Sequence, residues 1–160
     1  MTENQPFSQY RTKVQPGWID CNGHMNVPYY VLAFDQATDS FFDHVGVDES
    51  YRQETNCSIF VAETHVNYLR ELHEGAPLYV TTRLLDLNEK RVHLFHQMFH
   101  EDAGYLAAST DIIIVHVDLG RRRSVDWGEM PGKKLQQIHA AHGKLTWPDK
   151  AGRQIGIKSG

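Results

Sequence analysis

The sequence predicts an α+β fold in which an antiparallel sheet wraps around one long helix. Three observations lead to this class. One long segment has the apolar spacing of a helix, several later segments alternate with a period of two, and short polar turns separate those segments. Short turns between strands favour an antiparallel meander, and the helix must bury its apolar face against that sheet. With 160 residues and 41% hydrophobic content, we expect a single domain over 1–160.

The first expected elements are a strand and the long helix. From Val27 onward the apolar residues recur in steps of three and four, which predicts a helix of about five turns with one buried face. Asn26 is a suitable N-cap, and Gly46 is a suitable stop. A strand is expected before the helix at 10–19, with an interruption at Pro16-Gly17.

Four strands and a short helix follow along the chain. We expect strands at 58–70, 77–87, 91–100 and 105–119, then a helix at 131–142 and a loose tail. The segment Asp111–Val115 is apolar on both faces, as in a strand that is covered on both sides, so one face is expected on the helix and the other on a partner. The core is expected within about 10–119.

Composition excludes several classes of function. The net charge is −4, and Lys and Arg are scattered except in Arg121–Arg123, which argues against nucleic-acid binding. The polar start is not a signal peptide, and no apolar run reaches membrane-spanning length. The two cysteines, Cys21 and Cys57, are expected to be free thiols in a reducing cytoplasm. Cys21 is not favoured as a nucleophile, because no base is adjacent in the sequence.

Several histidines are candidates for metal ligands or bases. On a helix, His93, His96 and His100 would share a face and suggest a metal site, whereas on a strand His93 and His96 point to opposite faces. Aromatic content and flanking turns favour the strand, so we expect no metal. Glu63 and His65 lie two residues apart on one face of a strand, either as a solvent-facing pair or in a cleft.

Two basic segments have two interpretations each. Arg121–Arg123 and the pair Lys90-Arg91 can be ordinary solvated loops. They can also hold the phosphates of a nucleotide, because guanidinium groups recognise phosphate well. The sequence alone leaves both alternatives open.

The segment "WIDCNGHMNVPYY", at 18–30, is the strongest candidate for a site. Asn22 and Gly23 suit a turn, Asn26 suits a cap, and Asp20 can bond loop amides. A helix start also offers unpaired amides with positive dipole character, which can polarise a carbonyl oxygen. A carboxylate beside such a helix start suits acyl transfer.

This segment resembles the signature of a known family. Asp20-x-x-Gly23-His24-Met25-Asn26, followed by Tyr29-Tyr30 early in a long helix, is similar to the motif of hot-dog-fold acyl-CoA thioesterases of the hydroxybenzoyl-CoA thioesterase-like branch. The resemblance covers roughly 10–119. It implies a sheet wrapped around the helix, and homodimers or dimers of dimers with active sites at the subunit interface. It also implies an acyl-CoA substrate and no metal; CoA is part of the substrate, so no separate cofactor is expected.

The resemblance also implies roles for individual residues. Asp20 matches the catalytic carboxylate, as general base or nucleophile, and the backbone near Asn26 is expected to hold the thioester oxygen. His24 is expected to order the loop. We therefore expect catalytic roles for Asp20, Asn26 and His24, and substrate contacts from Trp18, Gly23, Tyr29, Tyr30, Lys90 and Arg91. Some members have a second acidic residue before the glycine, where this chain has Cys21-Asn22, so Asp20 is the only carboxylate in the loop.

A narrower likeness concerns the acyl group. The segments 22–26, 34–47 and 90–98 are similar to those of thioesterases linked to carnitine breakdown, which hydrolyse betainyl-CoA. An aromatic cage can hold a trimethylammonium group, and the candidates near the loop are Trp18, Tyr29, Tyr30 and Phe34, although Phe34 suits the core better. Short or medium acyl-CoA is the alternative substrate. Two other functions remain: an enoyl-CoA hydratase or dehydratase that uses His24 or His65, and a non-catalytic acyl-CoA binding module.

Overall fold

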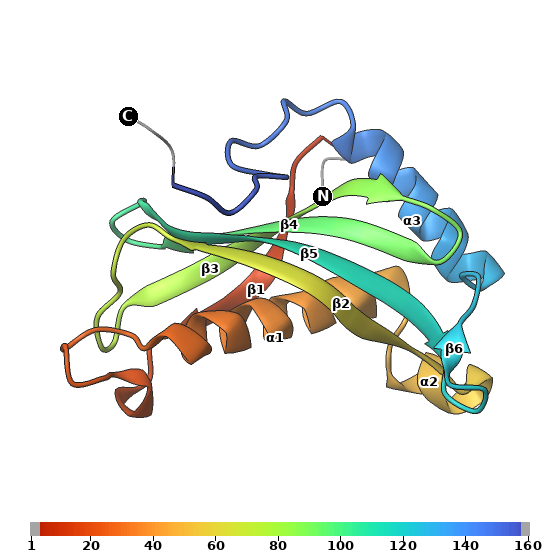
Figure 1. Ribbon diagram of the computed structural model, residues 1–160, viewed down its shortest axis with the longest axis horizontal. Coiled ribbons are helices and arrows are strands. Elements are labelled where there is room, and N and C mark those ends of the chain that lie inside the picture. The colour runs from red at the N-terminus through yellow and green to blue at the C-terminus, as the bar shows by residue number, and fades with distance from the viewer. Residues whose placement is uncertain (1–3, 158–160) are drawn as a thin grey trace.

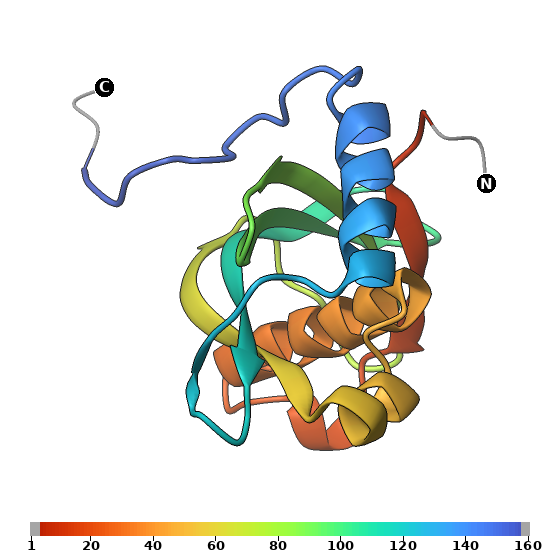
Figure 2. The ribbon, with the colours of Figure 1, turned by 90° about the vertical axis from the view of Figure 1, so that its right-hand side faces the viewer.

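A curved antiparallel sheet wraps around helix α1 (Val27–Val45) in the computed structural model, which describes residues 4–157. The strand order is β1-β3-β4-β5-β2, and the short strand β6 pairs with β5. Figure 1 shows α1 lying along the concave face of the sheet, and Figure 2 shows the sheet curling around the helix when seen from one end. The predicted fold class is confirmed.

Most of the predicted elements are present. Besides α1, the structure contains β1 (Phe7–Lys13), η1 (Pro16–Trp18), α2 (Glu49–Thr55), β2 (Cys57–Tyr68), β3 (Pro77–Leu87), β4 (Arg91–His100), β5 (Leu106–Asp118), β6 (Arg123–Ser124) and α3 (Glu129–His142). The prediction of a strand at 10–19 was wrong in its bounds. Proline at 16 lacks a backbone N–H, and the chain forms a single 3₁₀ turn there instead of a ladder. Helix α2 was missed because it buries no residue and so has no apolar period.

Both ends of α1 follow the sequence signals. The side-chain oxygen of Asn26 accepts a hydrogen bond from the Val27 N–H, and Gly46 ends the helix in the left-handed conformation at φ 97°. The buried face carries Tyr30, Ala33, Phe34, Ala37, Thr38, Phe41, Phe42 and Val45. Full burial of a large apolar side chain contributes about 1.5–3 kcal/mol, so this face holds the helix against the sheet.

The core has two clusters along α1. The first surrounds the beginning of the helix and contains Met25 and Tyr30, and the second surrounds its end and contains Phe41 and Phe42. The core extends beyond the expected 10–119, because Phe7 and Leu135 are buried in the second cluster. Residue 135 belongs to α3, which packs beside β3.

His93 and His96 lie on opposite faces of β4 and have different surroundings. His96 faces α1, where its Nε2 and Nδ1 lie 2.8 Å from Thr38 Oγ1 and 2.9 Å from Thr82 Oγ1. Burial lowers the pKa of His96 to about 3, so the ring is neutral and links the helix to the sheet. His93 lies on the opposite face, with its Nε2 2.6 Å from Asp111 Oδ1. The opposite orientation of the two rings is the one that a strand predicts.

The outer face of the sheet, opposite α1, is covered in part by the end of α3 and the tail. The Arg83 guanidinium donates to the carbonyl oxygens of His142 at 3.1 Å and Leu145 at 3.3 Å. Beyond α3 the chain crosses the sheet, and the Gly152 N–H donates to Asp111 Oδ1 at 2.9 Å. Part of the C-terminal segment is therefore tied to the sheet.

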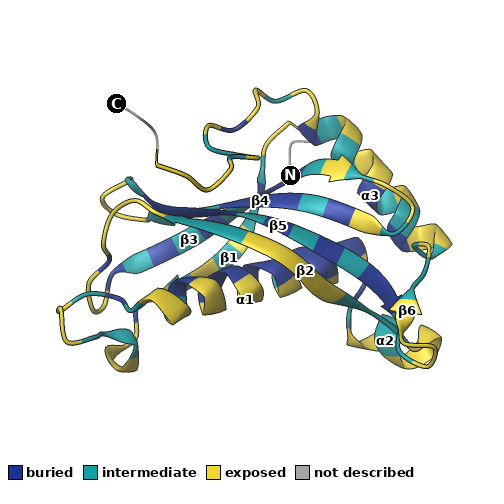
Figure 3. Ribbon diagram, in the orientation of Figure 1, coloured by how far each residue is buried: buried dark blue, intermediate teal, exposed yellow. Residues whose placement is uncertain are grey.

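Strand β2 forms one edge of the sheet. None of its twelve residues is buried, and within residues 4–157 no strand pairs with its outer side. Figure 3 shows the exposed stretch along β2 beside the largely buried β5. Phe60, Val61 and Tyr68 are 44%, 47% and 45% exposed. Such an open edge is suited to pairing with another chain. None of the helices in this part of the chain has the length and apolarity that crossing a membrane requires.

Candidate active site

The loop between η1 and α1 is a tight hairpin with Asp20 and Asn26 on its two arms. The Asp20 N–H donates to the His24 carbonyl at 3.1 Å, and the Asn26 N–H donates to the Trp18 carbonyl at 2.8 Å. Gly23 has φ 82°, a conformation that a residue with a side chain rarely adopts. The glycine is thus required by the turn that brings the two arms together.

The hairpin is anchored to the connection between β2 and β3. Met25 is buried, and its N–H donates to the Leu72 carbonyl at 2.8 Å. This contact brings Glu71 and His73 to the loop. The carboxylate of Glu71 lies 3.9 Å from His24 Nε2 and 3.5 Å from His73 Nε2. Sequence reasoning missed Glu71, because no pattern in the chain places residue 71 beside residue 24.

The Asp20 carboxylate has one oxygen bound and one free. Its Oδ1 accepts a hydrogen bond from the Asn22 N–H at 2.9 Å, which fixes the side chain within the turn. Among the described residues, nothing bonds to Oδ2. The loop-bonding and catalytic interpretations of Asp20 are therefore compatible, since each uses a different oxygen.

The start of α1 offers fewer free amides than the sequence suggests. The Val27 N–H is bound by Asn26 Oδ1 at 2.9 Å, Pro28 has no N–H, and the Tyr29 N–H donates to the Asn26 carbonyl at 3.0 Å. The side-chain Nδ2 of Asn26 makes no hydrogen bond within residues 4–157. Because its Oδ1 is turned toward the helix, Nδ2 is the donor that remains at this helix end.

Two aromatic pairs flank the loop. The rings of Trp18 and Tyr29 are stacked, with centroids 5.6 Å apart and an interplanar angle of 12°. The rings of Tyr30 and Tyr68 are perpendicular, with centroids 5.3 Å apart and an angle of 87°. Tyr68 was not predicted, because it lies at the end of β2, far from the loop in sequence.

A hollow of about 200 Å³ opens beside the perpendicular pair. Its walls are His24, Met25, Val27, Tyr30, Tyr68, Leu69, Arg70 and Glu71. The loop, the helix start and the end of β2 therefore meet at one cavity. Phe34 does not line it: this ring is 3% exposed and stacks on His96 within the core.

The predicted phosphate-binding residues lie at the end of the molecule opposite the Asp20 loop. Lys90 ends the turn between β3 and β4, and Arg91 is the first residue of β4. Arg121 and Arg122 lie between β5 and β6, and Arg123 is the first residue of β6. Figure 1 shows the Asp20 loop at the left end of the molecule and β6 at the right end. One chain does not bring these basic groups to Asp20.

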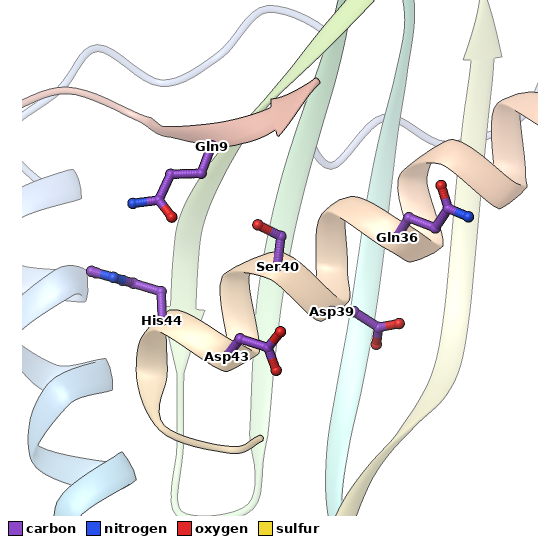
Figure 4. Close-up of a pocket in the computed structure, with 6 residues that line it drawn as sticks. All are labelled: Gln9, Gln36, Asp39, Ser40, Asp43 and His44. Carbon is purple, nitrogen blue, oxygen red and sulfur yellow. The ribbon is translucent and has the colours of Figure 1, made fainter. Parts of the chain in front are cut away.

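Further hollows lie away from Asp20. Glu63 and His65 line one of about 430 Å³ on the outer face, together with His93 and Asp111, although Glu63 is itself exposed. Another lies along the exposed side of α1, where Figure 4 shows Asp39 and its neighbours from α1 beside Gln9 of β1. Within residues 4–157, no group of three His, Cys, Asp or Glu side chains is arranged to hold a metal ion, and both cysteines are free.

The sheet wrapped around α1, with the Asp20 hairpin at the helix start, is the hot-dog architecture. The model of the thioesterase-like superfamily matches residues 14–136. The chain belongs to this superfamily, and it is a hydrolase of the acyl-CoA thioesterase kind.

Individual relatives are similar over nearly the whole chain. A betainyl-CoA thioesterase from Pseudomonas aeruginosa is 34% identical, with 96% of this chain and 97% of the relative covered. An L-carnitine dehydrogenase/betainyl-CoA thioesterase from Rhizobium meliloti is 36% identical over 96% of this chain, which spans 31% of that longer protein. A hypothetical protein from Staphylococcus aureus, solved in complex with CoA, has a TM-score of 0.89 and 27% identity, with 97% of each chain covered.

Proposed function

We propose that this protein hydrolyses betainyl-CoA to betaine and CoA, with Asp20 as general base or nucleophile. The observation that carries the proposal is the hairpin that holds a free carboxylate oxygen of Asp20 and the free side-chain amide of Asn26 on paired arms. The names of the relatives from Pseudomonas aeruginosa and Rhizobium meliloti support the choice of acyl group.

The chemistry follows from these two groups. Asn26 Nδ2 donates to the thioester carbonyl oxygen, where negative charge develops as the carbon becomes tetrahedral. Asp20 Oδ2 either takes a proton from the attacking water or attacks the carbon itself. The carbon–sulfur bond then breaks, and the CoA thiolate leaves. When Asp20 is the nucleophile, water next hydrolyses the acyl–aspartyl anhydride, which releases betaine and restores the carboxylate. His24, whose Nδ1 lies 3.2 Å from the Met25 carbonyl oxygen, orders the loop.

A twofold dimer through β2 completes the site. Antiparallel pairing of two β2 strands reverses one chain relative to the other, so the β6 end of the partner comes beside the Asp20 end of this chain, which are the right-hand and left-hand ends of the single chain in Figure 1. The Arg121–Arg123 loop of the partner then faces the approach to Asp20, where Arg binds the phosphates of CoA. Lys90 and Arg91 lie at the same end and serve in the same way. The two free thiols fit a reducing cytoplasm.

A thiol-release screen tests the proposal. Betainyl-CoA is compared with acetyl-, butyryl- and octanoyl-CoA, and hydration of crotonyl-CoA is followed in parallel. We expect the highest kcat/KM with betainyl-CoA. Hydration without thiol release would favour the hydratase alternative, and tight CoA binding without turnover would favour a binding module. A sedimentation mass equal to the 18.4 kDa single chain would contradict the dimer.

A further inference from the structure

We propose that Tyr30, Tyr68 and Glu71 form the subsite that recognises the cationic acyl group. This inference rests on the proposed function and names the residues that give it selectivity. A quaternary ammonium group has no N–H to donate, so a protein recognises it with aromatic faces and nearby negative charge. Both features meet at the hollow beside the Asp20 loop.

The two aromatic pairs differ in what they leave open. The rings of Trp18 and Tyr29 are nearly parallel, at 12°, so they cover each other's facing surfaces and leave no gap for a methylated cation. The rings of Tyr30 and Tyr68 meet at 87° and both line the hollow, so they form two walls of a corner. The perpendicular pair is therefore the better cation site.

One wall of this corner comes from helix α1 and the other from strand β2. Tyr30 is 4% exposed and packs in the first core cluster, so its ring is held in place by the body of the protein. Tyr68 is 45% exposed at the end of the edge strand. Burial raises the pKa of both phenols, which keeps the rings neutral at physiological pH.

The charges around the hollow favour a cation. The Glu71 carboxylate lines it and is only loosely paired, at 3.9 Å from His24 and 3.5 Å from His73. The one guanidinium in the lining, that of Arg70, is held 3.8 Å from the centroid of the Tyr105 ring, and Tyr105 is not part of the hollow. Within residues 4–157, no lysine or arginine forms an ion pair with Glu71, whose pairs are with the two histidines alone.

The hollow is also at the reacting end of the site. His24 and Val27 line it; His24 belongs to the hairpin that carries Asp20, and Val27 is the first residue of α1. An acyl group whose cationic end occupies the Tyr30–Tyr68 corner therefore has its carbonyl near the hairpin that carries Asp20 and Asn26. A short acyl chain such as betainyl is matched to a hollow of about 200 Å³.

A pair of isosteric substrates isolates recognition of the charge. Betainyl-CoA and 3,3-dimethylbutyryl-CoA have the same shape, but the second has a carbon in place of the quaternary nitrogen. The measured quantity is the ratio of their kcat/KM values. We expect the parent protein to prefer betainyl-CoA, and Tyr68→Leu to lower this preference about 3- to 30-fold. Tyr68→Phe keeps the ring and should keep most of the preference.

A second variant does not depend on packing. Glu71→Gln replaces an exposed carboxylate by an amide of the same size, so folding is not at risk, and it should lower the preference a few-fold, with less effect at high salt. Tyr79→Leu is the matched control, because Tyr79 stacks on Phe99 in β3 and β4, away from the hollow.

The outcomes separate the inference from the proposed function. An unchanged substrate ratio in both Tyr68→Leu and Glu71→Gln overturns the subsite, and so does a parent protein that hydrolyses the two substrates equally. Loss of all thioester hydrolysis in the parent protein would instead defeat the proposed function. A reduced ratio in both variants, with the ratio intact in Tyr79→Leu, supports the subsite.

Discussion

The two ends of the molecule carry different chemistry. At one end, the hairpin and the start of α1 present the Asp20 carboxylate, the Asn26 amide and an aromatic corner. At the other end, the turns after β3 and β5 and the first residues of the strands that follow present Lys90, Arg91 and Arg121–Arg123. Under the proposed function, the first end cleaves the thioester and the second holds phosphate, yet one chain keeps the two ends apart. Each complete site of the proposed dimer therefore takes its two parts from different chains.

The ends also differ in how their polar groups are held. The Asp20 end is tied by backbone hydrogen bonds to the β2–β3 connection, such as that from the Met25 N–H to Leu72. At the far end, Arg121 Nε lies 3.5 Å from Asp118 Oδ2 on the surface, and Arg122 lies 5.5 Å from the centre of the Phe60 ring. Exposed contacts of this kind contribute little to stability, so these arginines are free to serve a ligand.

The largest expected effect is at the chemical end. Asp20→Asn should lower kcat by about 10²- to 10⁴-fold, because the neutral amide can neither take a proton nor attack the carbonyl. Asparagine keeps an oxygen for the Asn22 N–H, so the melting temperature should stay at the parent value. The measurement is thiol release with betainyl-CoA. Asp126→Asn, at an exposed position in the other half of the chain, is the control, and parent turnover in Asp20→Asn would remove Asp20 from the mechanism.

The second effect tests the donor on the other arm of the hairpin. Asn26→Asp keeps an N-cap acceptor for the Val27 N–H but replaces the Nδ2 donor with a second acceptor, and we expect a loss of about 10²- to 10³-fold in kcat. Asn26→Ser also keeps a cap and adds no charge, so it should be equally slow. Thermal unfolding separates the roles: a slow enzyme with parent stability supports the donor, whereas a Ser variant with parent kcat rules it out.

The third prediction tests whether the arginines at the far end bind the substrate that is cleaved at the Asp20 end. Replacing Arg121, Arg122 and Arg123 with alanine should raise KM for betainyl-CoA about 10- to 100-fold, because charge-assisted hydrogen bonds to phosphate are lost. KM for betainyl-pantetheine, which lacks the nucleotide, should not change. An equal rise for both substrates would mean that these arginines do not bind phosphate.

Mixed dimers show which chain supplies the arginines. The Asp20→Asn chain and the triple-alanine chain are each defective alone. If the arginines act across the interface, a mixed dimer has one site with neither change, and random mixing should restore roughly a quarter of the parent activity at low substrate concentration. Failure to recover activity, with mixed dimers verified by mass, would mean that the arginines do not act across the subunit interface.

The smallest effect lies on α1 between the two ends, where Figure 4 shows Asp39. Partial burial and the carboxylates of Asp35 and Asp43, each four residues away, raise the pKa of Asp39. Asp39→Asn should therefore stabilise the fold at neutral pH by about 0.5 kcal/mol. A raised carboxyl pKa means that the folded state holds the proton more tightly than the unfolded state does. The parent protein therefore regains stability as the pH falls, and the stability difference between Asp39→Asn and the parent should vanish in acid. Urea unfolding at both pH values measures this, and equal gains at both would contradict the charge explanation.

The hairpin shows how far local signals reach. Asn22-Gly23 predicts the turn, Asn26 predicts the cap, and the chain forms both, because these effects involve residues only a few positions apart. The resemblance to hot-dog thioesterases pointed to Asp20 for the same reason, since its motif is a continuous stretch. The expectation of unpaired amides at the helix start was less accurate, because the Val27 N–H donates a hydrogen bond to the Asn26 side chain.

Local sequence signals could not predict the site residues that come from distant segments of the chain. Glu71 reaches His24 through the pairing of Met25 with Leu72, and Tyr68 reaches Tyr30 through the sheet. Neither contact has a spacing that a pattern can register. The stacking of Trp18 on Tyr29, which leaves the perpendicular pair as the open corner, depends on side-chain orientations that packing sets.

The sequence by itself determined the order of the main elements, the two ends of α1 and the position of the Asp20 motif, because periodicity, caps and turns are local properties of the chain. Only the tertiary structure decided which polar groups stay free at the helix start, which aromatic rings face a cavity, and that the basic residues lie at the opposite end from Asp20. These outcomes depend on how strands far apart in sequence pair within the sheet, and a hydrogen bond or ring contact exists only after that pairing is made.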